Sequence, residues 1–230
     1  MIDLNSIQDK IGYTFSDEAL LITALTHSSY TSEHGKLYSS NNERLEFIGD
    51  AYLDAIIGHK IYDIQRDAKE GVLSRKRADI VCATSLAEIA KDLDLGSYLL
   101  LGNGEELTGG RNRESMLADA LEALIGAVII DGGFAEGKRV VLALFEQKIR
   151  DAVQGRLDND YKSKLQEMIQ KKYRNNEIEY RIIDESGPAH DKSFTAEICF
   201  KGKVLGRGVG KSKAKAEQSA AMDVITKGEI

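Results

Sequence analysis

The stretch Asn42–Asp50, N-E-R-L-E-F-I-G-D, opens the segment that decides how this chain folds. Asparagine at 41 and 42 is a good helix-capping residue, and the apolar positions that follow recur at helical spacing. They predict a helix over residues 43–64. Four of its five carboxylates stand at offsets of 0, 3, 7 and 11 and so lie on one stripe: Glu43, Glu46, Asp50 and Asp54. For this helix alone, a solvated acidic face is the simpler interpretation.

A second helix, predicted over residues 114–130, changes that interpretation. Beyond its first residue, its only ionisable side chains are Asp119 and Glu122, at i and i+3. The rest of the helix is apolar nearly all round, which is typical of a buried helix. Two carboxylates in such a helix are costly unless they are paired or bind a metal. Arg111 and Arg113, just before the helix, are the alternative partners.

Together the two helices offer a set of hard oxygen ligands: Glu46, Asp50, Asp119 and Glu122. Such a set suits Mg²⁺ or Mn²⁺ rather than zinc. A carboxylate cluster of this kind supports phosphoryl displacement by metal-activated water. The sequence contains no phosphate-binding P-loop, no G-x-S-x-G and no H-E-x-x-H, and its four histidines are scattered. We therefore expect metal-dependent phosphoryl-transfer chemistry.

Outward from these helices, the periodicity divides the chain into two parts. Before residue 155 the pattern is helical, with further helices predicted over residues 16–25, 73–90 and 134–153. A helix around residue 165 follows, then strands over 177–183, 193–200 and 203–209, and a helix over 212–225. We predict an all-α domain (residues 1–152), a linker (153–159) and a small α+β domain of order α-β-β-β-α (160–228).

The composition fits this division. The chain has 230 residues, 42% of them hydrophobic, and a net charge of −6. Residues 158–230 carry 14 basic and 12 acidic residues, net +2, whereas residues 1–157 carry 17 and 25, net −8. The longest uncharged apolar run, Ala123–Ile130, is too short for a membrane span, and no secretory signal is visible. Two distant cysteines, Cys82 and Cys199, are typical of free thiols, so we expect a cytoplasmic protein without membrane attachment.

The quoted residues resemble the ribonuclease III family of endonucleases, and the C-terminal part resembles the double-stranded-RNA-binding domain that follows in bacterial members. The matching stretches are Ala24–Ser29, Asn42–Asp50, Leu73–Arg75 and Glu114–Ala123. Departures in the signature helix, at Ile48 and Ala51-Tyr52, are conservative and spare the carboxylates. The resemblance covers essentially the whole chain.

The resemblance implies a Mg²⁺-dependent endoribonuclease, with Mn²⁺ as a substitute, and assigns roles to individual residues. The catalytic carboxylates are Glu46, Asp50, Asp119 and Glu122; of these, Glu46, Asp119 and Glu122 are the metal ligands, and Asp50 and Glu122 act most directly. A homodimer cuts both strands of double-stranded RNA, leaving 5′-phosphate and 3′-hydroxyl ends with short 3′ overhangs. Ribosomal, messenger and other structured RNA precursors are the expected substrates.

Three further positions relate to the dimer. Phe47 is expected at the two-fold interface, with an ordinary core side chain as the alternative. Glu43 and Glu70 match acidic positions linked to cleavage-site selection across the dimer.

The C-terminal part carries the expected RNA contacts. Lys211, Lys213 and Lys215 cluster at the start of the last helix, where cations oppose the helix dipole unless an anion such as phosphate binds. The resemblance adds Gln166, Glu167 and His190 as minor-groove contacts. Ala214 stands where such domains usually carry a second consecutive lysine, so one phosphate contact is absent from the expected set.

Two other functions fit the sequence less well. A protein that binds duplex RNA without cutting it has no need of acids in an apolar helix. A metal-dependent phosphohydrolase of small molecules leaves the C-terminal domain unexplained.

Overall fold

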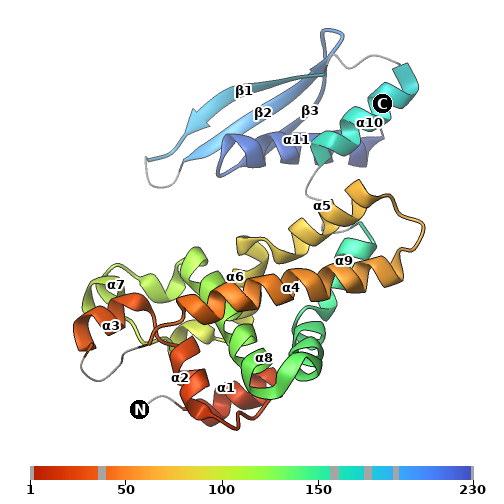
Figure 1. Cartoon of the computed structure of the whole chain (residues 1–230). Coiled ribbons are helices and arrows are strands. Elements are labelled where there is room, and N and C mark those ends of the chain that lie inside the picture. Colours follow the sequence, from red (N-terminus) through yellow and green to blue (C-terminus); the bar gives the residue numbers. More distant parts are fainter. Residues whose placement is uncertain (1–2, 36–39, 156–160, 174–177, 189–191, 229–230) are drawn as a thin grey trace. The chain divides into compact units, whose positions relative to one another are not determined.

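The computed structural model describes residues 3–35, 40–155, 161–173, 178–188 and 192–228. The chain divides into two compact units, Met1–Leu157 and Asp158–Ile230, called here the helical unit and the C-terminal unit (Figure 1). Their secondary structure confirms the predicted fold class. Residues 156–159 of the predicted linker lie outside the described residues. None of the helices that the structure describes is long and apolar enough to cross a membrane.

The helical unit contains nine α-helices among its described residues and two short 3₁₀ helices. In chain order they are α1 (Leu4–Ile11), α2 (Glu18–Ala24), α3 (Ser28–His34), α4 (Glu43–Ile64), α5 (Glu70–Val81), α6 (Ala83–Asp92), η1 (Leu95–Tyr98), α7 (Asn103–Leu107), η2 (Gly110–Asn112), α8 (Glu114–Leu144) and α9 (Glu146–Val153). Helix α4 has the predicted bounds, and Asn41 Oδ1 accepts a hydrogen bond from Glu43 N at 3.2 Å. Helices α1 and α3 were not predicted.

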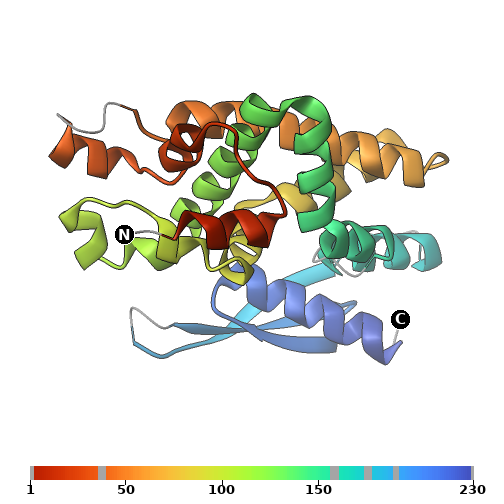
Figure 2. The same cartoon turned by 90° about the horizontal axis from the view of Figure 1, so that it is seen from below.

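Three predicted helix boundaries are wrong. Asp17, not Ser16, caps α2, because its side chain accepts a hydrogen bond from Ala19 N. The helix predicted over residues 73–90 is two helices, because Cys82 adopts extended backbone angles (φ −67°, ψ 152°) between α5 and α6. The helix predicted over residues 134–153 breaks at Phe145, while α8 changes direction earlier, at Gly133 (φ 80°, ψ 176°) (Figure 2).

Helix α8 supplies much of the core of the helical unit. Its residues from Met116 to Ile129 are buried except Asp119 and Glu122, which are half-buried. The prediction of a buried helix interrupted by two acids is therefore confirmed. The core around it is completed by apolar side chains of the other helices, among them Leu45, Leu53, Ile57, Leu86 and Phe145.

The C-terminal unit consists of α10 (Tyr161–Tyr173), β1 (Ile178–Ser186), β2 (Ser193–Phe200), β3 (Lys203–Gly210) and α11 (Lys213–Lys227). The strands form one antiparallel sheet in the order β1-β2-β3. Both helices pack on the same face of this sheet (Figure 1), because the core joins Leu165 and Ile169 of α10 to Ile198 of β2 and Val224 of α11.

Candidate active site

Two glycines set the distance between α4 and α8. A Cβ atom built at Gly49 would lie 1.9 Å from the carbonyl oxygen of Glu122, and one at Gly126 would lie 2.1 Å from the carbonyl oxygen of Leu45. Glycine is therefore required at both positions for the backbones to approach this closely. The contact brings the turn of α4 that carries Glu46 against the turn of α8 that carries Glu122.

Three carboxylates meet at this contact. Glu46, Asp119 and Glu122 each offer an oxygen, and these oxygens all lie within 4.8 Å of one another. All three side chains are half-buried. Asp50 lies one turn further along α4, is exposed and is outside this set of three. Its charge still acts on Glu122, whose pKa it raises.

The electrostatics of the cluster favour protonation in the absence of a cation. Burial, followed by the charges of Asp50 and Asp119, raises the pKa of Glu122 from 4.5 to about 8. Burial and Asp119 likewise raise the pKa of Glu46. Burial raises the pKa of Asp119, and the ring of His27 opposes that increase. Glu46 and Glu122 are thus destabilised as anions by burial and by neighbouring carboxylates, and Asp119 is destabilised by burial.

The arginines before α8 do not neutralise the cluster. Arg111 pairs with Glu106 at 2.6 Å and donates to the carbonyl oxygens of Gly96 and Leu99. Arg113 pairs with Glu105 at 2.8 Å. In the described part of the chain, no lysine or arginine forms an ion pair with the three clustered acids. The alternative of an arginine–carboxylate pair in this helix is therefore wrong.

The donor set fits a divalent cation. It consists of carboxylate oxygens alone, which Mg²⁺ and Mn²⁺ prefer over softer ligands. The acids are crowded and lack an ion-pair partner among the described residues, so a bound cation would relieve both the burial cost and the mutual repulsion. The residues that would hold it are Glu46, Asp119 and Glu122.

The raised pKa of Glu122 gives a pH-dependent stability in metal-free protein. Between pH 4.5 and about 8 the folded protein binds more protons at Glu122 than the unfolded chain, so stability falls as pH rises through this window. Glu122→Gln should therefore stabilise the metal-free protein at the upper end of this window, by about 1 kcal/mol after allowance for solvent screening. Near the lower end it should change little. Thermal unfolding in chelator at both pH values checks this, and an equal effect at both would contradict it.

The other predicted residues of the helical unit lie on its surface. Phe47 has 76% of its area exposed, so it is not a core side chain of this unit. Beside it lies an apolar hollow of about 720 Å³, lined among others by Leu20, Ile48 and Ile130. Glu43 is exposed at the start of α4. Glu70, exposed at the start of α5, accepts a hydrogen bond from Ser74 Oγ at 2.7 Å.

In the C-terminal unit, the predicted RNA-binding residues that the structure describes lie on α10 and around the start of α11. Lys211, Lys213 and Lys215 are exposed around the start of α11, where Ser212 Oγ caps the helix by accepting from Lys215 N at 3.2 Å. Ala214 is exposed between them. On α10, Gln166 and Glu167 are also exposed. His190 lies outside the described residues.

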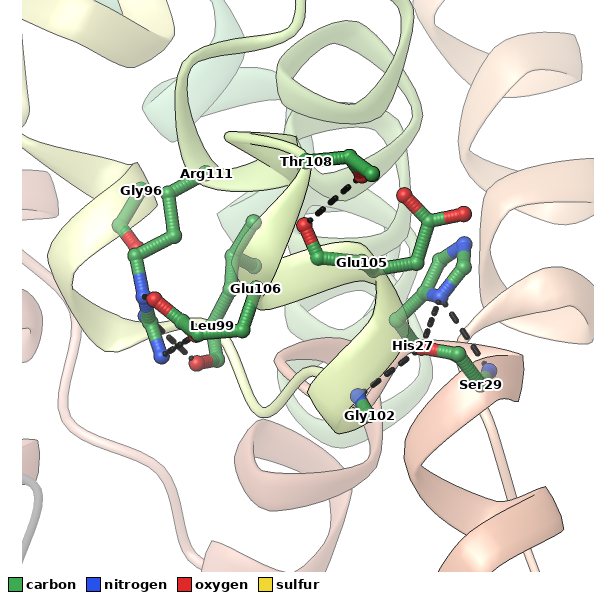
Figure 3. Close-up of polar contacts among 9 residues, drawn as sticks. All are labelled: His27, Ser29, Gly96, Leu99, Gly102, Glu105, Glu106, Thr108 and Arg111. Atoms are coloured by element: carbon green, nitrogen blue, oxygen red, sulfur yellow. Dashed lines mark hydrogen bonds and ion pairs between the residues drawn. The ribbon is translucent and has the colours of Figure 1, made fainter.

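Sequence reasoning missed one group of polar residues beside the carboxylates. The His27 ring caps α3 by accepting from Ser29 N, and Ser29 Oγ accepts in turn from Gly102 N (Figure 3). His27 belongs to one of the stretches that carry the family resemblance, but no spacing rule connects it to Gly102. The only sequence feature that could have indicated this cap is a histidine two residues before a serine at a helix start.

Comparison with known proteins agrees with both units. Residues 17–149 match the family described as Ribonuclease-III-like, and residues 161–227 match the double-stranded RNA binding motif. The chain is 46% identical over 224 residues to Ribonuclease 3 of Caldanaerobacter subterraneus, covering 97% of each chain. It is 48% identical over 221 residues to Ribonuclease 3 of Desulforamulus reducens, covering 96% of this chain and 89% of the relative.

A solved structure extends the comparison to the fold. The nuclease domain of ribonuclease III from Campylobacter jejuni is 41% identical and superposes with a TM-score of 0.59, covering 64% of this chain and 96% of that domain. The chain thus shares both its sequence and its arrangement of helices with proteins named as ribonuclease III. The chain belongs to the ribonuclease III family.

Proposed function

We propose that this protein is a divalent-metal-dependent endonuclease that cleaves double-stranded RNA. The observation that supports this most directly is the set of three crowded carboxylates at the contact of α4 and α8, in a chain that also carries a double-stranded RNA binding motif. Mg²⁺ is the proposed cofactor and Mn²⁺ its substitute. The proposed substrates are structured precursors of ribosomal and messenger RNA.

In this proposal the four carboxylates have different roles. Glu46, Asp119 and Glu122 hold the cation, which when bound supplies charge that polarises the phosphodiester and lowers the pKa of water. The pKa of Glu122, raised to about 8, means that this carboxyl would give up a proton on binding the cation near neutral pH. Asp50 is exposed and lies outside this group of three, and its proposed role is to take up a proton from the attacking water. Apolar side chains around α8 hold the ligands rigidly.

Assembly into a two-fold dimer would place two such clusters on one duplex. The exposed Phe47 and the apolar hollow beside it lie on the same face, and a two-fold axis lets each Phe47 meet the partner's face reciprocally. A solved structure of the Campylobacter jejuni nuclease domain is described as flexible in a region involved in dimer formation. Two cuts, one on each strand, would leave short 3′ overhangs with 5′-phosphate and 3′-hydroxyl ends. Glu43 and Glu70 are the proposed residues for cleavage-site selection.

A cleavage assay distinguishes this function from its rivals. A long RNA duplex incubated with protein and Mg²⁺ should be cut into short duplexes, while chelator should stop the reaction. A single strand of the same sequence should survive. Binding without cutting would favour a pure RNA-binding protein, and hydrolysis of small phosphodiesters alone would favour a phosphohydrolase.

The C-terminal unit is proposed to supply the phosphate contacts, through the lysines at the start of α11, while Gln166, Glu167 and His190 meet the minor groove. Lys213→Ala should weaken binding to all duplexes alike, because a phosphate contact carries no sequence information. The slope of log affinity against log salt should fall by about 0.9, taking the value for B-DNA as a guide. Lys227→Ala, at the other end of α11, is the control and should leave the slope unchanged.

We also propose that the protein acts in the cytoplasm, where thiols stay reduced. Its cysteines, Cys82 and Cys199, are both free.

A further inference from the structure

Two side chains of α11 hold the start of α10. The first N–H groups of any helix have no partner within that helix. In α10 one of them, Lys162 N, donates to Gln218 Oε1 at 3.1 Å. The ammonium group of the same residue forms an ion pair with Glu217 Oε2 at 2.6 Å. Both the backbone and the side chain of Lys162 are therefore bound to α11.

The same ammonium group also contacts the sheet. Lys162 Nζ lies 4.5 Å from the centre of the Tyr180 ring on β1, a distance typical of a cation–π contact. Tyr180 in turn packs against the core between the sheet and the two helices. The side chains of Lys162 and Glu217 are only 36% and 22% exposed, so water screens this pair less than an open surface pair. Helices α10 and α11 and strand β1 thus meet at one charged side chain.

This junction lies next to both sets of proposed RNA contacts. Gln166 follows Lys162 by four residues on α10, and Glu217 follows Lys213 by four residues on α11. Residues at this spacing are neighbours on one face of a helix. The ion pair is therefore one turn from a proposed minor-groove contact and one turn from a proposed phosphate contact. An A-form duplex presents its minor groove and its phosphates at fixed separations, so the two helices must be held at a matching distance.

We propose that Lys162 is a positioning residue for RNA binding: through its ion pair with Glu217 it fixes α10 against α11 and so sets the distance between the minor-groove and the phosphate contacts. A preorganised surface loses less freedom on binding, so a residue that touches no RNA can still raise the affinity for it. The role differs from that of a phosphate contact, because the Lys162 ammonium already faces a carboxylate. It rests on the proposed function, because it assumes that both helices meet the duplex.

Removal of the acid separates positioning from simple electrostatics. Glu217→Ala takes a negative charge away from the unit that binds a polyanion, so charge alone predicts tighter binding. Positioning predicts weaker binding, by about 5-fold, which is within the range for substitutions that do not contact the ligand. The measurement is the affinity of the full-length protein, in chelator, for an RNA duplex of about 20 base pairs, long enough for one such domain. Glu179→Ala is the matched control: it removes an acid paired with Arg181 on β1 and should not weaken binding.

Two substitutions of the lysine complete the test. Lys162→Arg keeps a cation for both the ion pair and the ring, and should bind as the wild type does. Lys162→Met should bind about 5-fold more weakly, with an unchanged slope of log affinity against log salt. A slope lower by about 0.9 would assign Lys162 to a phosphate and overturn the positioning role.

Wild-type or tighter binding by Glu217→Ala would overturn the role as well, and so would an equal loss in Glu179→Ala. Thermal unfolding shows whether each variant is folded at the assay temperature; if Glu217→Ala is not, the affinity and slope of Lys162→Met decide. The proposed function is scored separately, on duplex binding by the wild type and on the flatter slope of Lys213→Ala. If those two results hold while Glu217→Ala binds normally, only the positioning role is refuted.

Discussion

Glu122→Gln should abolish Mg²⁺-dependent cleavage of duplex RNA while leaving RNA binding intact. The substitution keeps the size of the side chain but removes one of three anionic ligands, at the position where the other acids converge. Metal stabilisation of a phosphoryl transition state amounts to several kcal/mol, and each 1.36 kcal/mol is tenfold in rate. We therefore expect a loss of about 10³-fold or more in the single-turnover cleavage rate, with duplex affinity unchanged because the C-terminal unit is untouched.

The control for this loss is Glu114→Gln, an exposed acid in the first turn of the same helix. It should cleave at the wild-type rate. Calcium offers a second check on the wild type, because Ca²⁺ prefers more ligands and looser geometry than Mg²⁺. It should permit duplex binding without efficient cutting. Mg²⁺-dependent cleavage by Glu122→Gln at a rate near the wild type would refute the proposed metal site.

The helices that bring the acids together could be predicted because their patterns are local. The span of α4 follows from its apolar spacing and from asparagines at its start. The burial of α8 follows from the absence of charge around Asp119 and Glu122. Neither pattern shows that these two helices touch. That information resides in Gly49 and Gly126, whose cost to a helix of about 1 kcal/mol each is the visible sign of a close approach.

The incorrect helix boundaries have local causes that helix propensity does not reveal. Nothing in the apolar spacing marks the extended backbone at Cys82, because the residues on both sides of it favour a helix. The ion-pair partners of Arg111 and Arg113 could not be predicted either. The number of charges does not show whether these arginines pair with Glu105 and Glu106 or with the acids of α8. In the structure, Arg111 pairs with Glu106 and Arg113 with Glu105, both on α7.

Phe47→Asp should convert the proposed dimer into a monomer. Phe47 is 76% exposed, an unusual position for a phenylalanine, and it adjoins an apolar hollow on the same face. At a two-fold interface one substitution acts twice, since both protomers carry it. Burying two carboxylates without partners costs several kcal/mol, which is enough to shift a micromolar dimer to monomer at working concentrations. Sedimentation of the full-length protein measures this directly.

The matched control is Leu107→Asp, an apolar side chain that is 88% exposed at the end of α7. It introduces the same charge on the same unit and should leave the dimer intact. Because Phe47 contributes little to the core of its own unit, Phe47→Asp should still fold, bind Mn²⁺ and bind duplex RNA through the C-terminal unit. What it should lose is the coordinated cutting of both strands, so that nicked duplexes replace short products with 3′ overhangs. A variant that stays dimeric would place the two-fold contact on another face, and the apolar hollow beside Phe47 would then need a different occupant.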